Sequence, residues 1–139
     1  RWRSDFKTQV ERCTADDAVG APVARVLRPE ENDYFVLKPR HSGFYASALE
    51  VLLQSLGAKK LIITGFAADI CVLFTANDAY MRDYEIIIPA DCIASETISA
   101  KQTACRQMKR FLRADMRLSN RLRFESGSVK KQRIRTASS

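Results

Sequence analysis

Histidine and closely spaced cysteines are scarce in this sequence. It contains one histidine, His41, and four cysteines that lie far apart and form no Cys-x-x-Cys motif. One imidazole and scattered acidic residues do not supply the ligand set of a metal site, and they do not define a Cys/His dyad. We therefore expect no metal and no cofactor. The wide spacing also predicts reduced thiols at all four positions, Cys13, Cys71, Cys92 and Cys105.

Long apolar runs are absent as well. No stretch approaches the length of a membrane-spanning helix, and the N-terminal residues RWRSDFKTQVERC contain no apolar signal region. With 139 residues and 46% hydrophobic content, the chain has the size and composition of about one globular domain. These properties predict a cytoplasmic protein that does not bind a membrane.

The basic charge is concentrated at one end of the chain. Residues 101–139 contain twelve Lys or Arg and two acidic residues, whereas residues 1–100 carry a net charge of −3. Residues 118–139 have few apolar residues, no sustained periodicity and a Gly/Ser break, which predicts a basic, disordered tail. Basic tails can bind phosphate backbones, but this one has a single aromatic residue, Phe124, and no nucleic-acid-binding motif. Nucleic acid is therefore disfavoured as a partner.

Apolar periodicity predicts alternating strands and helices. Continuous apolar runs indicate strands that are buried on both faces, and such strands form parallel sheets covered by helices. The predicted fold is thus a three-layer α/β fold with a parallel sheet and helices on both faces. The expected strands span residues 34–37, 60–64 and 85–88, and the expected helices span 5–13, 44–56, 70–82 and 96–113, with a Gly/Pro-rich connection over 20–33.

Two residues with chemical potential follow predicted strands. Cys71 comes after LIITG at the start of a helix, where free N–H groups and the helix dipole favour a thiolate. Lys38 follows YFVL, so both residues are expected at the carboxyl edge of the sheet, where such folds bind ligands. By itself, Cys71 is equally compatible with a buried structural cysteine. For Lys38, a surface lysine is the default interpretation when no resemblance is considered.

Three stretches of the sequence resemble the isochorismatase-like cysteine hydrolases: GFAADICV, TANDAYMRDYEIIIPADCIAS and FVLKPRHSGFYASALEVLLQSLGAKKLIITG. This superfamily includes nicotinamidases and N-carbamoylsarcosine amidohydrolase. The resemblance covers roughly residues 1–115 and implies an Asp-Lys-Cys triad with Lys38 and Cys71 in two of its roles. It also implies an oxyanion hole formed by the backbone N–H groups of Ala67 and Cys71, with a cis peptide bond between Phe66 and Ala67.

Other residues receive less specific assignments. Trp2, Phe44 and Tyr45 are candidates for the lining of a substrate pocket, although aromatic residues near strand ends are more often core or dimer contacts. Asp69 is most simply a helix N-cap. Asp91 and Cys92, which follow a strand, are predicted to be structural. The metal-binding Asp and His residues of nicotinamidases have no counterpart in residues 1–40, which disfavours that activity.

The third member of the triad is the main departure from the family pattern. None of the acidic residues before Lys38 follows an apolar strand, so none is assigned as the catalytic Asp: Asp5, Asp16, Asp17 and Asp33. The pattern therefore predicts a hydrolase domain over residues 1–117 that lacks its N-terminal strands.

Two functions follow from this departure. The first is a cysteine hydrolase, dimeric or larger, that acts on a small amide-like or related metabolite. The second is an inactive remnant or binding subunit that lacks the general base. We expect residues 1–139 alone not to show the turnover of a complete enzyme. The substrate, and whether an amide or a vinyl ether is cleaved, is not indicated by the sequence.

Overall fold

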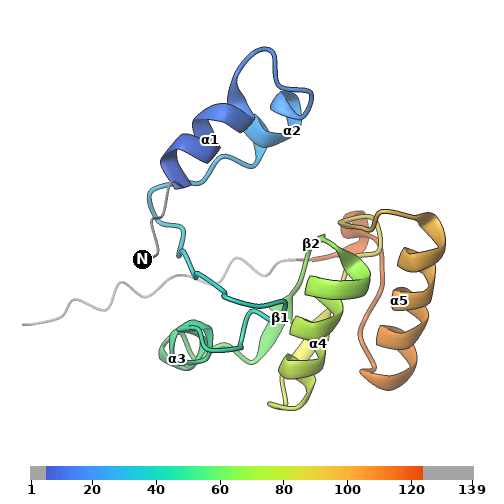
Figure 1. Cartoon of the computed structure of the whole chain (residues 1–139). Helices are drawn as coiled ribbons and strands as arrows, with labels where there is room; N and C mark the ends of the chain where they lie inside the picture. The colour runs from blue at the N-terminus through green and yellow to red at the C-terminus, as the bar shows by residue number, and fades with distance from the viewer. Residues whose placement is uncertain (1–5, 124–139) are drawn as a thin grey trace, which may run out of the picture. The chain divides into compact units, whose positions relative to one another are not determined.

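The computed structural model describes residues 6–123, which fall into two compact units that divide between Phe35 and Val36 (Figure 1). The first unit consists of α1 (Phe6–Thr14) packed against α2 (Ala21–Val26). The Arg25 guanidinium joins them by donating to the Thr14 carbonyl at 3.1 and 3.2 Å and by pairing with Asp16. The helix predicted over residues 5–13 is thus confirmed, whereas α2 lies within the predicted connection.

The second unit contains an α/β arrangement with parallel strands. Strand β1 (Lys60–Ile62) pairs in parallel with β3 (Glu85–Ile87), and β2 (Gly65–Phe66) pairs in parallel with β4 (Ile93–Ala94). The parallel α/β fold predicted from the apolar runs is confirmed. The remaining elements are α3 (Leu49–Ser55), a π-helical turn η1 (Ala68–Val72), α4 (Leu73–Tyr80), α5 (Ile98–Phe111) and a 3-10 turn η2 (Ser119–Arg121).

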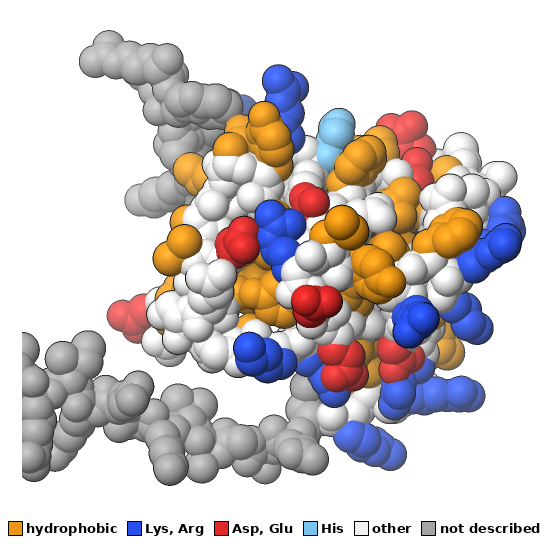
Figure 2. Space-filling model, turned by 90° about the horizontal axis from the view of Figure 1, so that it is seen from below, with side chains coloured by type: hydrophobic (Ala, Val, Ile, Leu, Met, Phe, Trp, Pro, Cys, Tyr) orange, Lys and Arg blue, Asp and Glu red, His pale blue; other side chains and the backbone are white. Residues whose placement is uncertain are grey.

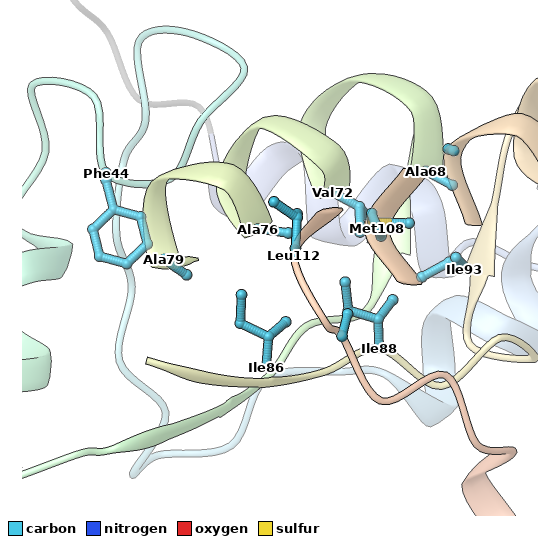
Figure 3. Close-up of a cluster of buried hydrophobic side chains, with 12 residues drawn as sticks. Phe44, Ala68, Val72, Ala76, Ala79, Ile86, Ile88, Ile93, Met108 and Leu112 are labelled. Atoms are coloured by element: carbon cyan, nitrogen blue, oxygen red, sulfur yellow. The ribbon is translucent and has the colours of Figure 1, made fainter. Parts of the chain in front are cut away.

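The hydrophobic core lies between these strands and the neighbouring helices α4 and α5. Figure 3 shows Ile86 and Ile88 directed toward α4 and the end of α5. The Ile88 and Met108 side chains are both 0% exposed. Buried alanines on the facing helices leave room for these larger side chains, as close packing of an interior requires: Ala76, Ala79 and Ala104.

Local signals set the ends of two helices. The Thr97 hydroxyl accepts a hydrogen bond from the Ala100 N–H at 3.1 Å and caps α5. After α3, Gly57 has a φ of +63°, a conformation that glycine adopts without the steric cost imposed by a Cβ. The helix predicted to end at residue 56 thus ends within one residue of that position.

Two predicted elements differ from the structure. Residues 34–37 form no strand, because among the described residues no other strand pairs with them. The helix expected from residue 44 begins only at Leu49. Ala46 has a φ of +47°, outside the helical region, and the Ser47 hydroxyl donates to the Gly43 carbonyl, so residues 43–48 form turns instead.

The segment that begins at residue 118 was expected to be a disordered tail. Residues 118–123 are described, and Ser119 within η2 hydrogen bonds to Asp91 through its N–H at 2.8 Å and its hydroxyl at 2.6 Å. The rest of that segment, residues 124–139, lies outside the described residues.

The surface of the described residues carries both hydrophobic and charged side chains. Figure 2 shows hydrophobic side chains interspersed with acidic and basic ones, and basic side chains gather on the side where Figure 1 draws α5. None of the helices from residue 6 to residue 123 is both long enough and apolar enough to span a membrane.

Candidate active site

Cys71 lies in the π-helical turn that directly follows β2. Ala67 precedes the turn, and its carbonyl accepts hydrogen bonds from the N–H groups of Ile70 at 3.2 Å and Val72 at 3.0 Å. Val72 is buried in the core, whereas Cys71 is partly exposed. The turn is therefore anchored in the core through Val72, while Cys71 stays partly exposed.

The Lys38 ammonium group approaches this thiol. Its Nζ lies 3.6 Å from the Cys71 Sγ and donates to the Arg40 carbonyl at 3.1 Å. The proximity predicted for these two side chains is confirmed, although their chemical roles stay predictions. In the part of the chain that the structure describes, Lys38 forms no ion pair with a carboxylate.

The segment that carries Lys38 is fastened to α4 by polar and aromatic contacts. The Gly43 N–H donates to the Thr75 hydroxyl at 2.9 Å, and the Ser42 hydroxyl donates to the Asp78 carboxylate. On α4, Phe74 lies one helical turn before Asp78, and its ring is 5.8 Å from the His41 ring. Periodicity and motif spacing did not identify Ser42, Thr75 and Asp78 as contributors to the site, because each is an ordinary polar residue in its local sequence.

One backbone feature near Cys71 is the one that the family resemblance implied. The Phe66–Ala67 peptide bond is cis, as the resemblance implied. Ala67 itself is buried, and its N–H group belongs to this cis peptide bond. The role of the Ala67 N–H as an oxyanion donor stays a prediction.

Asp69 does not cap the helix, so that prediction was wrong. Its carboxylate accepts a hydrogen bond at 2.5 Å from the Ser95 hydroxyl, which follows β4, and the N-terminus of η1 has no side-chain cap. This contact adds a side-chain link next to the β2–β4 pairing. It was not apparent from the sequence because Asp69 and Ser95 are 26 residues apart.

The three aromatic candidates for a substrate pocket have different positions. Phe44 is 5% exposed and belongs to the hydrophobic core, where Arg82 lies over its ring at 4.8 Å, so we exclude it from the site. Tyr45 is exposed, and its predicted role stays a prediction. Trp2 lies outside the described residues.

Asp91 and Cys92 make contacts of a structural kind. The hydroxyl and N–H of Ser119 donate to the Asp91 carboxylate, and these bonds hold the pKa of that carboxyl below its ordinary value of 3.8. The Cys92 carbonyl accepts from the Gly65 N–H at 3.0 Å next to the β2–β4 pair. Between residues 6 and 123, no group of three His, Cys, Asp or Glu side chains is arranged to hold a metal ion.

Comparisons with known proteins identify a matching family model and similar sequences. The isochorismatase domain model matches residues 1–116. The isochorismatase family protein YaaI of Bacillus subtilis is 44% identical over 115 residues, which are 83% of this chain and 62% of YaaI. A ureidoacrylate amidohydrolase, RutB of Methylorubrum extorquens, is 43% identical over 65 residues, or 47% of this chain and 26% of that protein. The chain thus spans less than two thirds of either relative.

A solved structure has a similar fold. The crystal structure of N-carbamoylsarcosine amidase from Thermoplasma acidophilum superposes with a TM-score of 0.66 and 28% sequence identity. The match covers 88% of this chain and 70% of that one.

Proposed function

Because the chain belongs to the isochorismatase family, we propose that it carries the nucleophile of a cysteine hydrolase that acts on a small amide-like metabolite. The observation that carries the proposal is the 3.6 Å contact between the Lys38 Nζ and the Cys71 Sγ, at the start of the helical segment after β2. An ammonium group next to a thiol favours the negatively charged thiolate, which is the nucleophilic form.

The proposed reaction has two steps. The Cys71 thiolate attacks the carbonyl carbon of the substrate, the carbon–nitrogen bond breaks, and the amine leaves after it takes up a proton. Water then cleaves the thioester, which releases the acid and restores the thiol. During both steps, the N–H groups of Ala67 and Cys71 are assigned to stabilise negative charge on the carbonyl oxygen.

This chain is assigned the nucleophile, the cation and the oxyanion donors. In the first step a general acid must give a proton to the leaving amine, and in the second step the same group, now a general base, must take a proton from the attacking water. The described residues place no carboxylate in an ion pair with Lys38, so the base is not assigned to any of them.

The names of two similar proteins narrow the first substrates to test. Ureidoacrylate and N-carbamoylsarcosine both contain a carbonyl group between two nitrogen atoms. Compounds with this ureido group, together with simple amides, are therefore the first members of a test panel. Isochorismate completes the panel as a vinyl ether, because the family model is named after the enzyme that cleaves it.

Turnover of the complete protein on this panel tests the proposal. We expect hydrolysis of at least one amide or ureido compound, loss of that activity in Cys71→Ala, and an acyl group on the Cys71 peptide when the reaction is quenched and analysed by mass spectrometry. Cys105→Ala is the matched control, since Cys105 packs beside the core and has no assigned role. Binding without hydrolysis, or activity that survives Cys71→Ala, would contradict the proposal.

A further inference from the structure

We infer that Ser42, Thr75 and Asp78 are positioning residues that hold the Lys38 ammonium against the Cys71 thiol. The inference rests on the proposed function, in which that contact supplies the nucleophile. It adds three residues for which neither the sequence motifs nor the family resemblance provided a role.

The need for positioning residues follows from the backbone around Lys38. Residues 36–48 consist of turns, bends and irregular chain, and no strand pairing holds this segment among the described residues. A lysine side chain has many rotamers, and fixing it beside one sulfur atom has an entropic cost. Other contacts must therefore hold residues 36–48 to η1 and to α4, which directly follows it.

Thr75 supplies the first of these contacts. Its hydroxyl oxygen accepts a hydrogen bond at 2.9 Å from the N–H of Gly43, five residues after Lys38. The approach is close here: a Cβ added to Gly43 would lie 3.5 Å from the Thr75 methyl carbon and 3.0 Å from Leu49. Thr75 lies one helical turn after Cys71, so the same part of the helix carries the nucleophile and binds the lysine segment.

Ser42 and Asp78 supply the second contact. The Ser42 hydroxyl donates to the Asp78 carboxylate and accepts from the N–H of Phe44 at 3.1 Å. Ser42 is 6% exposed, so a lost partner would leave a buried polar group without compensation. Thr75 and Asp78 are three residues apart and therefore share one face of α4.

The far end of the segment is fixed by the core. Phe44 packs in the hydrophobic cluster beside Ala79, as Figure 3 shows, and Arg82 covers its ring at 4.8 Å. Arg82 also forms an ion pair with Glu50 of α3 at 3.0 Å. With Phe44 held in this way, the Ser42 and Thr75 contacts determine the path of the four residues between Lys38 and Gly43.

The ratio of two alkylation rates at Cys71 tests the inference without any substrate. Iodoacetate is an anion and iodoacetamide is neutral. The rate with iodoacetate divided by the rate with iodoacetamide therefore reports the positive charge beside the thiol, and changes in thiol accessibility cancel in this ratio. Rates are measured on the full chain by mass spectrometry of the Cys71 peptide. We expect Lys38→Ala to lower the ratio by roughly threefold or more, because a unit charge within a few ångströms is removed.

Positioning variants should have the same effect. We expect Thr75→Val and Ser42→Ala to lower the ratio about as much as Lys38→Ala does. Thr75→Ser keeps the acceptor oxygen, so its ratio should equal that of the wild type. Asp78→Ala gives a contrast in sign: loss of a negative charge alone would raise the ratio, whereas loss of positioning lowers it. Asn77→Ala is the matched control, because within residues 6–123 its side chain donates only to the Leu73 carbonyl on its own helix.

Double variants complete the test. In a Lys38→Ala background, Thr75→Val and Ser42→Ala should change the ratio no further, because residues that act through Lys38 are not additive with its loss. A merely structural role would produce additive changes, or would leave the ratio unchanged while lowering the thermal midpoint, and either result would overturn the inference.

Failure of the proposed function gives a different pattern. In that case the complete protein hydrolyses nothing on the panel while the rate ratio still depends on Lys38, Ser42 and Thr75. If Lys38→Ala itself leaves the ratio unchanged, the contact between Lys38 and Cys71 is absent in solution, and the inference fails with it.

Discussion

The Lys38 ammonium and the Cys71 thiol lie 3.6 Å apart although 33 residues separate them in the chain. Lys38 lies in an irregular segment and Cys71 in a π-helical turn, so regular secondary structure alone does not bring them together. Their proximity distinguishes Cys71 from the other three cysteines, none of which hydrogen bonds to a cation within the described residues.

Cys71 should be the first thiol to react with a small alkylating agent near neutral pH. Exposure alone would favour Cys13, which is exposed, whereas Cys71 is only partly exposed. A nearby ammonium favours the thiolate and should outweigh this difference. Limited alkylation with iodoacetamide followed by peptide mass spectrometry measures the order. Earlier modification of Cys13, Cys92 or Cys105 in the folded protein would contradict the assignment of the nucleophile.

Lys38→Ala should lower the turnover number of the complete protein by at least about tenfold on any panel compound that it hydrolyses, because removal of a preorganised charge at a reacting centre has effects of that size or larger. The Lys38 side chain is exposed, so its loss should change the free energy of unfolding by less than about 0.5 kcal/mol. Steady-state kinetics and a thermal melt check both statements. Lys59→Ala, at another exposed lysine, is the control, and equal turnover in the two variants would argue against a catalytic role.

The contact between Asp91 and Ser119 should make the free energy of unfolding depend on acidic pH. The pKa of Asp91 is lower in the folded protein than its ordinary value of 3.8. The unfolded chain therefore binds more protons in this range, and the stabilisation is present above pH 3.8 and disappears as the pH falls through the lowered pKa.

Asp91→Asn isolates this effect. Its thermal midpoint should lie below that of the wild type at pH 7, and the difference should shrink as the pH falls below 3.8. Asp83→Asn removes a different exposed carboxylate and controls for the change in net charge. A difference between wild type and Asp91→Asn that stays constant with pH would show that the Ser119 contact does not form in solution.

Ile88→Ala should be strongly destabilising. The Ile88 side chain is 0% exposed between the strands and the helices α4 and α5, and truncating it leaves a cavity in a closely packed core (Figure 3). Such substitutions lower the free energy of unfolding by about 2–5 kcal/mol. Urea denaturation followed by circular dichroism measures the change.

Ile98→Ala is the matched control, since the same side chain is 78% exposed at the start of α5. Its effect should stay within about 0.5 kcal/mol, because it creates no cavity. Equal losses in the two variants would mean that the core differs from the one described.

Several features could be predicted because their signals are local or depend on general rules of parallel sheets. The apolar runs around Leu61 and Ile86 identify β1 and β3, and Gly57 marks the end of α3. The position of Cys71 after a strand and Lys38 after an apolar run placed both at one edge of the sheet. The strands β2 and β4 have two residues each, too few to show a period, and were not predicted separately.

Other features depended on partners that are distant in the chain. YFVL has the composition of a strand, but a strand also requires a neighbouring backbone to pair with, and the described residues provide none. Asp69 has the local signature of an N-cap, yet its partner is Ser95, 26 residues later. Phe44 was a candidate for the lining of a substrate pocket, but its side chain is buried in the hydrophobic core.

The sequence by itself therefore determined the α/β class, the main strands and helices, and the two residues with the clearest chemistry, because propensity, periodicity and chain order are properties of neighbouring residues. Tertiary structure alone decided how Lys38 is held at Cys71. Thr75 and Asp78 reach Gly43 and Ser42 across 32 and 36 residues. A hydroxyl or carboxylate can accept hydrogen bonds from many donors, and only the packing of the segment against α4 selects which donor it meets.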